Sequence, residues 1–282
     1  MIRRLAIVGV GLLGGSVARA ARARAVAGEI VGIGRDRARL AAALGDGALD
    51  HATTDLSQGV ADADLVVLGA TVAANEALLA RVWSAAAEGA VVTDVGSTKR
   101  SIVRASERLG ATRPLAFVGS HPMAGSERSG YAASRADLFD GALVIVTPTD
   151  ATDPRAVKGV TAFWEALGAR VTALDPVTHD RGVAAISHLP NLVAHALMAA
   201  VARDGAEALP LAARGFRDTT RIAASDPAMW TDIFLDNRDA LLPRVAEFRR
   251  ALEALETLIR AGDKAALAAA LARIKTAREG LA

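Results

Sequence analysis

A histidine in a segment of small residues is the side chain of this sequence best suited to acid–base chemistry. His121 lies in Gly-Ser-His-Pro-Met-Ala-Gly-Ser-Glu at residues 119–127, which follows a short apolar run at 115–118 that is typical of a strand. Because a residue before proline is pushed toward extended backbone, we expect His121 on a loop at the carboxyl end of that strand. Ligands of open α/β sheets bind at this edge. His121 would therefore present an acid–base group to a bound cofactor.

A glycine-rich turn near the amino terminus predicts that cofactor. Its spacing is Gly-x-Gly-x-x-Gly, directly after a strand-like segment and at the start of a helical one, which is the context of a dinucleotide-binding fingerprint. The glycines permit a tight turn and a close approach to a pyrophosphate, which rests on the helix amino terminus. The predicted cofactor-binding residues of this turn are Gly9, Gly11, Leu12, Leu13 and Gly14.

The end of the second strand indicates which dinucleotide binds. In NAD enzymes an Asp or Glu there usually accepts the ribose 2′-hydroxyl, whereas this chain has Gly34 followed by Arg35. Gly34 would not repel a 2′-phosphate, and Arg35, with Arg37, could pair with it. Asp36 comes one residue too late for the usual geometry, although a shifted register would let it bind the ribose of NAD. We therefore expect NADP to be favoured over NAD.

Three more histidines occur in the second half of the chain. His188 and His195 are seven positions apart with Asn191 between them, so all three share one helical face. We expect His179 and His195 to serve in capping or packing, while His188 suits either packing or the active site. We expect no zinc site, because no His-x-x-x-His pair or cysteine completes one.

A polar cluster at residues 215–223 lies ahead of a helix start at Ser225-Asp226-Pro227. Asp218 and Arg221 in this cluster could form a simple surface ion pair. Their Gly, Thr and Phe neighbours in an otherwise apolar region favour an anion clamp instead.

Alternating strands and helices predict the architecture that positions these residues. Strands at 5–8, 30–33, 65–68, 90–93, 115–118, 143–147 and 170–174 alternate with helices at 13–25, 37–44, 75–86 and 156–167. This alternation is typical of a doubly wound, mostly parallel Rossmann sheet. From Thr178 onward only helical spacing is found. We expect a dinucleotide-binding domain at 1–175 and an all-helical domain at 176–282, in which Leu252, Leu255 and Ile259 face a core or a dimer partner.

Composition narrows the function classes. The 282 residues carry a formal net charge of +2 and show no basic stripe with interleaved aromatics, so we do not expect nucleic-acid binding. The chain has no cysteine, signal peptide or apolar run of membrane-spanning length. We expect a cytoplasmic protein that acts on a small molecule and does not bind a membrane.

Taken together, these motifs resemble the prephenate and arogenate dehydrogenase family over nearly the whole chain. The resemblance rests on the amino-terminal glycine turn, Asp-Val-Gly-Ser-Thr-Lys at 94–99, Ser-His-Pro-Met-Ala-Gly at 120–125, Ser-His-Leu-Pro at 187–190 and Asp-Thr-Thr-Arg-Ile-Ala at 218–223. It implies oxidative decarboxylation of a cyclohexadienyl ring in tyrosine biosynthesis. Hydride passes to NAD(P)+, the carboxylate leaves as CO2, and the ring becomes aromatic.

The resemblance also implies roles for individual residues. His121 would draw the proton from the ring hydroxyl, and Ser97 would orient His121 or that hydroxyl. Thr71 would touch the cofactor, and the helical domain would form a homodimer. Arg221 would bind a substrate carboxylate, and Trp230 would form an apolar wall. Ser126 and Glu127 would line the pocket, and His188 and Asn191 would contact the substrate from the Ser-His-Leu-Pro helix.

One residue departs from the family pattern. Some prephenate-preferring members have a second histidine where this chain has Asn191. An amide accepts as well as donates hydrogen bonds, so Asn191 is compatible with an amino group in place of a keto oxygen. Arogenate is therefore a candidate substrate, alone or beside prephenate.

Two alternatives belong to other classes. A β-hydroxyacid or imine reductase would need a lysine on the first long helix of the second domain, and the four lysines, Lys99, Lys158, Lys264 and Lys275, lie elsewhere. A non-catalytic nucleotide sensor would have lost the His121 segment and the Arg221 cluster, which are both present.

Overall fold

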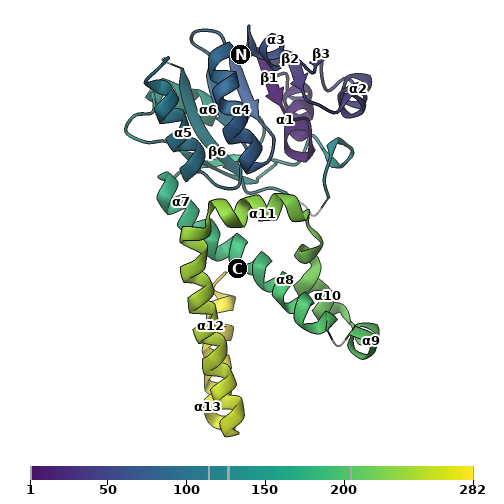
Figure 1. The fold of residues 1–282 in the computed structure, drawn as a ribbon, viewed down its shortest axis with the longest axis vertical. Coiled ribbons are helices and arrows are strands. Elements are labelled where there is room, and N and C mark those ends of the chain that lie inside the picture. The colour runs from purple at the N-terminus through teal and green to yellow at the C-terminus, as the bar shows by residue number, and fades with distance from the viewer. Residues whose placement is uncertain (1, 114, 126–127, 204, 282) are drawn as a thin grey trace.

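The computed structural model describes residues 2–113, 115–125, 128–203 and 205–281. A sheet flanked by helices forms the first part of the molecule, and a group of helices lies against one edge of it (Figure 1). This arrangement confirms the predicted Rossmann domain followed by a helical domain.

The sheet has eight strands in the order β3-β2-β1-β4-β5-β6-β7-β8. They are β1 (Ile2–Val8), β2 (Ala27–Ile33), β3 (His51–Thr53), β4 (Leu65–Leu68), β5 (Val91–Asp94), β6 (Ala116–Pro122), β7 (Leu143–Thr147) and β8 (Arg170–Ala173). All neighbours pair in parallel except β6 and β7, which are antiparallel. Strand order reverses between β1 and β4, and this switch point is where such sheets bind ligands.

Helices cover both faces of the sheet because the strands are apolar on both sides. Along β1, Leu5 and Ile7 pack into one core, and Ala6 and Val8 pack into the other. The helices of this domain are α1 (Leu12–Ala23), α2 (Arg37–Gly45), α3 (Leu56–Val60), α4 (Val72–Ala85), α5 (Arg100–Gly110), the short 3-10 turn η1 (Tyr131–Ala133) and α6 (Pro154–Ala166). β3, α3 and α5 are not among the predicted elements, because they are too short or too strongly charged to give a clear apolar pattern.

The end of β6 differs from the expectation. His121 lies within the strand, paired with Ile145 of β7, rather than on a loop after it. Pro122 favours extended backbone before it, and β7 supplies antiparallel hydrogen-bonding partners for residues 119–122. His121 is consequently held more rigidly than a loop would hold it.

The second domain is helical throughout the residues that the structure describes. Its elements are α7 (Pro176–Val183), η2 (Ala184–His188), α8 (Leu189–Ala202), α9 (Gly205–Ala208), η3 (Leu209–Leu211), α10 (Arg214–Thr220), η4 (Arg221–Ala224), α11 (Pro227–Asp236), α12 (Arg238–Ala261) and α13 (Lys264–Glu279). Asp226 caps α11 as predicted, and Gly262 ends α12 in the left-handed conformation. Figure 1 shows α12 and α13 as a long pair that projects away from the sheet.

Candidate active site

The glycine turn has the geometry that a pyrophosphate needs. Gly9 has a φ of +101°, and a Cβ on Gly14 would lie 2.1 Å from the Gly9 carbonyl oxygen. Both positions therefore require glycine for the turn itself. A Cβ on Gly11 would meet no protein atom within 4 Å, so that position opens onto free space. Helix α1 begins at Leu12 without a side-chain cap, and this leaves its first N–H groups available to an anion.

The end of β2 brings arginines near the ribose position. Gly34 follows the strand, and Arg35 comes next. Asp36 caps α2, accepting hydrogen bonds from the backbone N–H groups of Ala38 and Arg39, and it also forms an ion pair with the Arg39 side chain at 2.9 Å. Asp36 is therefore engaged locally. On the next crossover, Thr71 caps α4 by accepting from Ala74 N at 3.5 Å.

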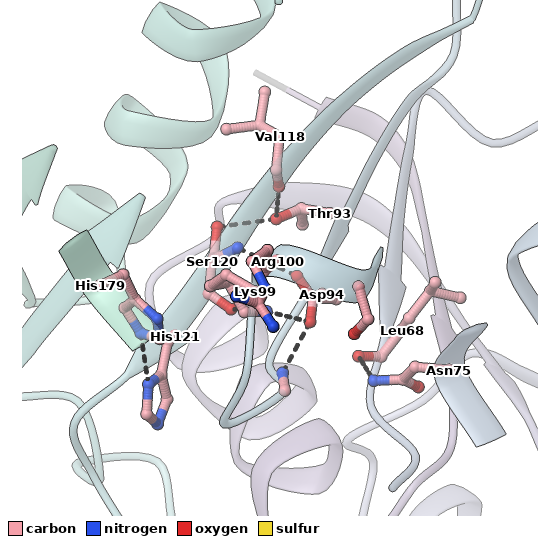
Figure 2. Close-up of polar contacts among 12 residues, drawn as sticks. Leu68, Asn75, Thr93, Asp94, Lys99, Arg100, Val118, Ser120, His121 and His179 are labelled. Atoms are coloured by element: carbon pink, nitrogen blue, oxygen red, sulfur yellow. Dashed lines mark hydrogen bonds and ion pairs between the residues drawn. The ribbon is translucent and has the colours of Figure 1, made fainter. Parts of the chain in front are cut away.

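A chain of hydrogen bonds supports the His121 ring, and Figure 2 shows the first of them, to His179. Its Nδ1 lies 2.9 Å from Nε2 of His179, and Nδ1 of His179 lies 2.8 Å from Oδ1 of Asp180. The Asp180 carboxylate accepts from the backbone N–H groups of Lys99 and Arg100 at 2.9 and 3.0 Å, at the start of α5. His179 thus contacts the predicted base, a role beyond the packing or capping expected from the sequence. The sequence carried no signal for this contact, which joins residues 58 positions apart.

A buried ion pair fixes the strands around His121. Lys99 is fully buried, pairs with Asp94 and donates to the Ser120 carbonyl oxygen at 2.9 Å. Asp94 also accepts from the backbone N–H groups of Ser120 and Gly96 at 3.0 and 2.8 Å. These bonds tie β5 to β6 and shape the loop that carries Ser97, a half-buried residue. Lys99 belongs to the family block at 94–99, but its pairing with Asp94 and Ser120 is not predicted from the sequence.

Burial determines the protonation of the two site histidines. Burial, followed by the nearby His179 and Lys99, holds the pKa of His121 well below its usual 6.5. Burial also lowers the pKa of His188 to about 4, against the opposing pull of Asp180. Burial raises the pKa of Asp180, but hydrogen bonds from His179 and the start of α5 outweigh that effect and leave it below 3.8. At neutral pH, His121 and His188 are therefore neutral and Asp180 is ionised.

The helical domain contains buried polar atoms without hydrogen-bond partners among the described residues. Asn237 donates to Nδ1 of His188 at 3.1 Å, so the His188 proton must reside on Nε2, which is buried without a partner among the described residues. The Trp230 ring stands edge-on to His188, with centroids 6.1 Å apart, and its indole N–H also lacks a partner among them. Asn191 donates to the Ile222 carbonyl oxygen at 3.1 Å. Its Oδ1 is likewise buried and without a partner in the described part of the chain.

Other predicted contacts have mixed outcomes. Ser126 and Glu127 lie outside the described residues. Arg221 is exposed at the start of η4. The Asp218 carboxylate pairs with Arg214 at 3.3 Å, in an exposed i,i+4 ion pair, and the anion clamp of Asp218 and Arg221 stays a prediction. His195 bonds the Asn191 backbone oxygen at 2.9 Å, which is the packing role expected of it.

Comparison with known proteins decides the family. The model for the prephenate dehydrogenase nucleotide-binding domain matches residues 17–173, and the model for the prephenate dehydrogenase dimerization domain matches residues 175–273. The chain belongs to the prephenate dehydrogenase family. The expected resemblance, fold and reaction class are therefore confirmed.

Individual members of the prephenate dehydrogenase family are similar over their full length. Cyclohexadienyl dehydrogenase from Zymomonas mobilis is 35% identical, with 93% of this chain and 90% of that protein covered. A crystal structure of Aquifex aeolicus prephenate dehydrogenase with hydroxyphenyl propionate and NAD+ has a TM-score of 0.93 at 34% identity, covering 100% of this chain and 99% of that one. Synechocystis arogenate dehydrogenase has a TM-score of 0.83 at 31% identity, covering 99% and 100%.

As a prephenate dehydrogenase family member, this chain is an oxidoreductase of tyrosine biosynthesis that uses a nicotinamide cofactor. The turn at Gly9, Gly11 and Gly14 would hold the pyrophosphate of that cofactor, which supplies a hydride acceptor when bound. His121, a buried imidazole with a lowered pKa, is held at the same edge of the sheet as that turn. The helical domain adds buried donors on His188 and Trp230 and a buried acceptor on Asn191 that have no partner among the described residues.

Proposed function

We propose that this chain oxidatively decarboxylates arogenate, alone or beside prephenate, and favours NADP. The observation that carries the arogenate assignment is the orientation of Asn191. Its amide N–H is committed to Ile222 O, which leaves Oδ1, an acceptor, buried and without a partner among the described residues. Arogenate carries an ammonium group, which donates hydrogen bonds, where prephenate carries a keto oxygen, which only accepts. An acceptor at this position therefore complements arogenate.

His121 would act on the substrate's ring hydroxyl in this proposal. Its Nε2 would take the hydroxyl proton as the oxygen gains carbonyl character, while hydride leaves the same carbon and the ring carboxylate departs as CO2. A base that is neutral at physiological pH is ready to accept that proton. Ser97 would bind the hydroxyl, Arg221 a substrate carboxylate, and Thr71 the cofactor. We retain Ser126 and Glu127 as pocket residues from the resemblance alone.

The preference for NADP rests on the end of β2. Asp36 is used as a helix cap and an ion-pair partner, so it is poorly placed to accept the ribose hydroxyl of NAD. Arg35 stands beside it with no acidic residue at Gly34 to repel a 2′-phosphate. The Aquifex aeolicus structure contains NAD+, so both dinucleotides must be compared directly.

We further propose a cytoplasmic homodimer with domains divided at residue 175. Helices α7, η2 and α8 form one 27-residue helix, Pro176–Ala202, and an 18-residue window of it, with a mean hydropathy of 1.4, would suit a membrane span by length and composition alone. His179, Asp180 and His188 on this helix are buried in polar contacts within the protein. These contacts favour a core helix over a membrane span.

The reductase and sensor alternatives are less well supported. The only lysine near His121 in the described residues is Lys99, and its ammonium is consumed by Asp94 and Ser120 O, so it is not presented to a substrate. A nucleotide sensor without catalytic activity would not require the buried hydrogen bonds from His121 to His179 and Asp180.

A crossed assay tests the proposal. NAD+ and NADP+ reduction is followed with prephenate and with arogenate, giving four values of kcat/KM. We expect the largest value for arogenate with NADP+. Exclusive use of prephenate would contradict the arogenate assignment, and a larger value with NAD+ would contradict the cofactor assignment.

Two variants sharpen this assay. Asn191→His should move the kcat/KM ratio toward prephenate, because imidazole donates to a keto oxygen. Arg35→Ala should weaken NADP+ binding about tenfold or more while affecting NAD+ little, as expected for loss of one charge-assisted phosphate contact. Arg155→Ala, which removes an exposed arginine on α6, serves as the control. Equal losses for both dinucleotides would show that Arg35 does not bind the 2′-phosphate.

A further inference from the structure

The donor and acceptor of each hydrogen bond between Asp180, His179 and His121 can be assigned by starting from the Asp180 carboxylate. Asp180 is ionised and accepts from two backbone N–H groups, so the His179 Nδ1 that faces it must donate. When His179 is neutral, its Nε2 is then an acceptor. The hydrogen bond at 2.9 Å therefore takes its proton from Nδ1 of His121. The lone pair of His121 is left on Nε2, the nitrogen directed away from this chain of bonds.

The same arrangement provides a place for positive charge. His121 lies near Lys99, whose charge and buried surroundings oppose a second cation there. His179 by contrast directly contacts the Asp180 carboxylate, and both are almost fully buried. A positive charge on His179 would therefore directly contact a carboxylate, whereas one on His121 would lie near the Lys99 ammonium.

We propose that His179 and Asp180 are positioning residues that fix the Nδ1–H tautomer of His121 and receive the positive charge when His121 accepts the substrate proton. This inference rests on the proposed function for the identity of that proton. The substrate O–H bond breaks and an Nε2–H bond forms on His121. The Nδ1 proton of His121 moves to Nε2 of His179, so His121 is again neutral and His179 is positive beside Asp180. After the product leaves, the proton returns from Nε2 of His179 to Nδ1 of His121, and Nε2 of His121 releases its proton to solvent.

The surroundings of His121 are consistent with this direction of charge movement. The titratable groups that face it are His179 and Asp180 on α7, His188 on η2, and Lys99 with its partner Asp94 on the sheet side. Asp94 is already neutralised by Lys99. Asp180 is consequently the carboxylate available to balance a proton gained by the two imidazoles.

The tautomer can be tested without any substrate. Long-range proton–nitrogen NMR spectra of the histidine-labelled full-length protein should show His121 protonated at Nδ1 and bare at Nε2 near pH 7.5. The His121 signals are assigned by their loss in His121→Asn. In His179→Leu, His121 should lose this single tautomer and become a mixture. A His121 protonated at Nε2 in the unaltered protein would overturn the inference, whatever the substrate proves to be.

Kinetics separate positioning and charge transfer from simple packing. His179→Gln retains an acceptor for the His121 Nδ1–H but cannot take its proton, whereas His179→Leu can do neither. We expect kcat to fall about 10²-fold or more in His179→Leu and by a smaller factor in His179→Gln, with KM and cofactor Kd within about threefold of normal. Equal kcat in the three proteins, or losses confined to KM, would overturn the inference.

The charge itself is tested by Asp180→Asn. Removing the carboxylate should make the histidine pair harder to protonate, which moves the acid limb of the kcat/KM profile to lower pH while kcat falls. A limb at its original pH with reduced kcat would assign Asp180 a structural role. Asp175→Asn, which alters an exposed cap on the same helix, is the matched control and should leave both the limb and kcat unchanged.

Discussion

His121 shows how one side chain acquires a catalytic protonation state from its surroundings. A solvent-exposed imidazole is partly charged at neutral pH, and a charged imidazole cannot accept a proton. Burial at 8% exposure and the charge of Lys99 keep His121 neutral. The hydrogen bond to His179 keeps the ring in one orientation.

Replacing this base gives the most direct prediction at the level of single residues. His121→Asn should lower turnover by about 10²–10⁴-fold, because an amide cannot accept the hydroxyl proton. The dissociation constant of the cofactor, measured by fluorescence titration, should stay near normal because the glycine turn is untouched. A variant with normal turnover would exclude His121 as the base.

His188 predicts a pH dependence of stability. Its pKa in the folded protein is about 4, below its unfolded value of 6.5, so the unfolded state binds a proton first as the pH falls. The stabilisation is complete above pH 6.5 and is lost progressively as the pH falls toward 4. The free energy of unfolding should decrease over this window by at most about 3 kcal/mol from this residue.

Urea unfolding at pH 7.5, 6 and 5 measures this effect, with His51→Gln as an exposed control. We expect a shallower decrease in His188→Gln than in the unaltered protein. A decrease of the same steepness in both would show that His188 is not the group responsible.

Among the secondary-structure elements, the β1–α1 unit is the one whose detailed geometry follows from sequence. Gly9 and Gly14 let the strand and helix backbones approach closely, and Gly11 leaves space above the helix amino terminus. The three glycines therefore serve two purposes: closure of the turn and access for a phosphate.

Two alanine variants separate these purposes. Gly14→Ala should destabilise the protein, because its Cβ would overlap the Gly9 carbonyl oxygen at 2.1 Å. Gly11→Ala should leave the Tm without cofactor unchanged and weaken cofactor binding, because its Cβ meets no protein atom and points into open space. Calorimetry with and without NADP+ measures both effects. Normal cofactor affinity in Gly11→Ala would place the pyrophosphate elsewhere.

At the scale of the whole molecule, the helical domain exposes several large apolar side chains on its last two helices. Leu252 and Ile259 on α12 are 55% and 64% exposed, and Leu271 and Ile274 on α13 are also more than half exposed. Leu252 and Ile259 are seven positions apart and share one helical face. Such rows are typical of a surface covered by a second subunit, in agreement with the dimerization domain matched there.

We therefore expect sedimentation at twice the 29.0 kDa chain mass. The double variant Leu252→Asp/Ile259→Asp should sediment as a monomer, because it places two charges in an apolar contact. Glu253→Lys, an exposed neighbouring change, should remain dimeric. A dimer that persists in the double variant would place the interface on another surface.

Local sequence determined much of this protein. Strands 65–68 and 143–147, the cap at Asp226 and the glycine turn all lie where residue types and spacing predicted them. These features depend on backbone preferences and periodic burial, which act between residues close in the chain. The family could be predicted for the same reason, since its motifs are short contiguous blocks.

The tertiary structure alone decided how the site is supported. The contact of His121 with His179, the bond from Lys99 to the Ser120 carbonyl oxygen and the orientation of Asn191 toward Ile222 all depend on where distant elements meet. The sequence around a histidine does not show whether its side chain packs in a core or contacts another catalytic group. Its role depends on the neighbours that folding brings within hydrogen-bond distance, and those neighbours are set by the packing of α7 against the edge of the sheet.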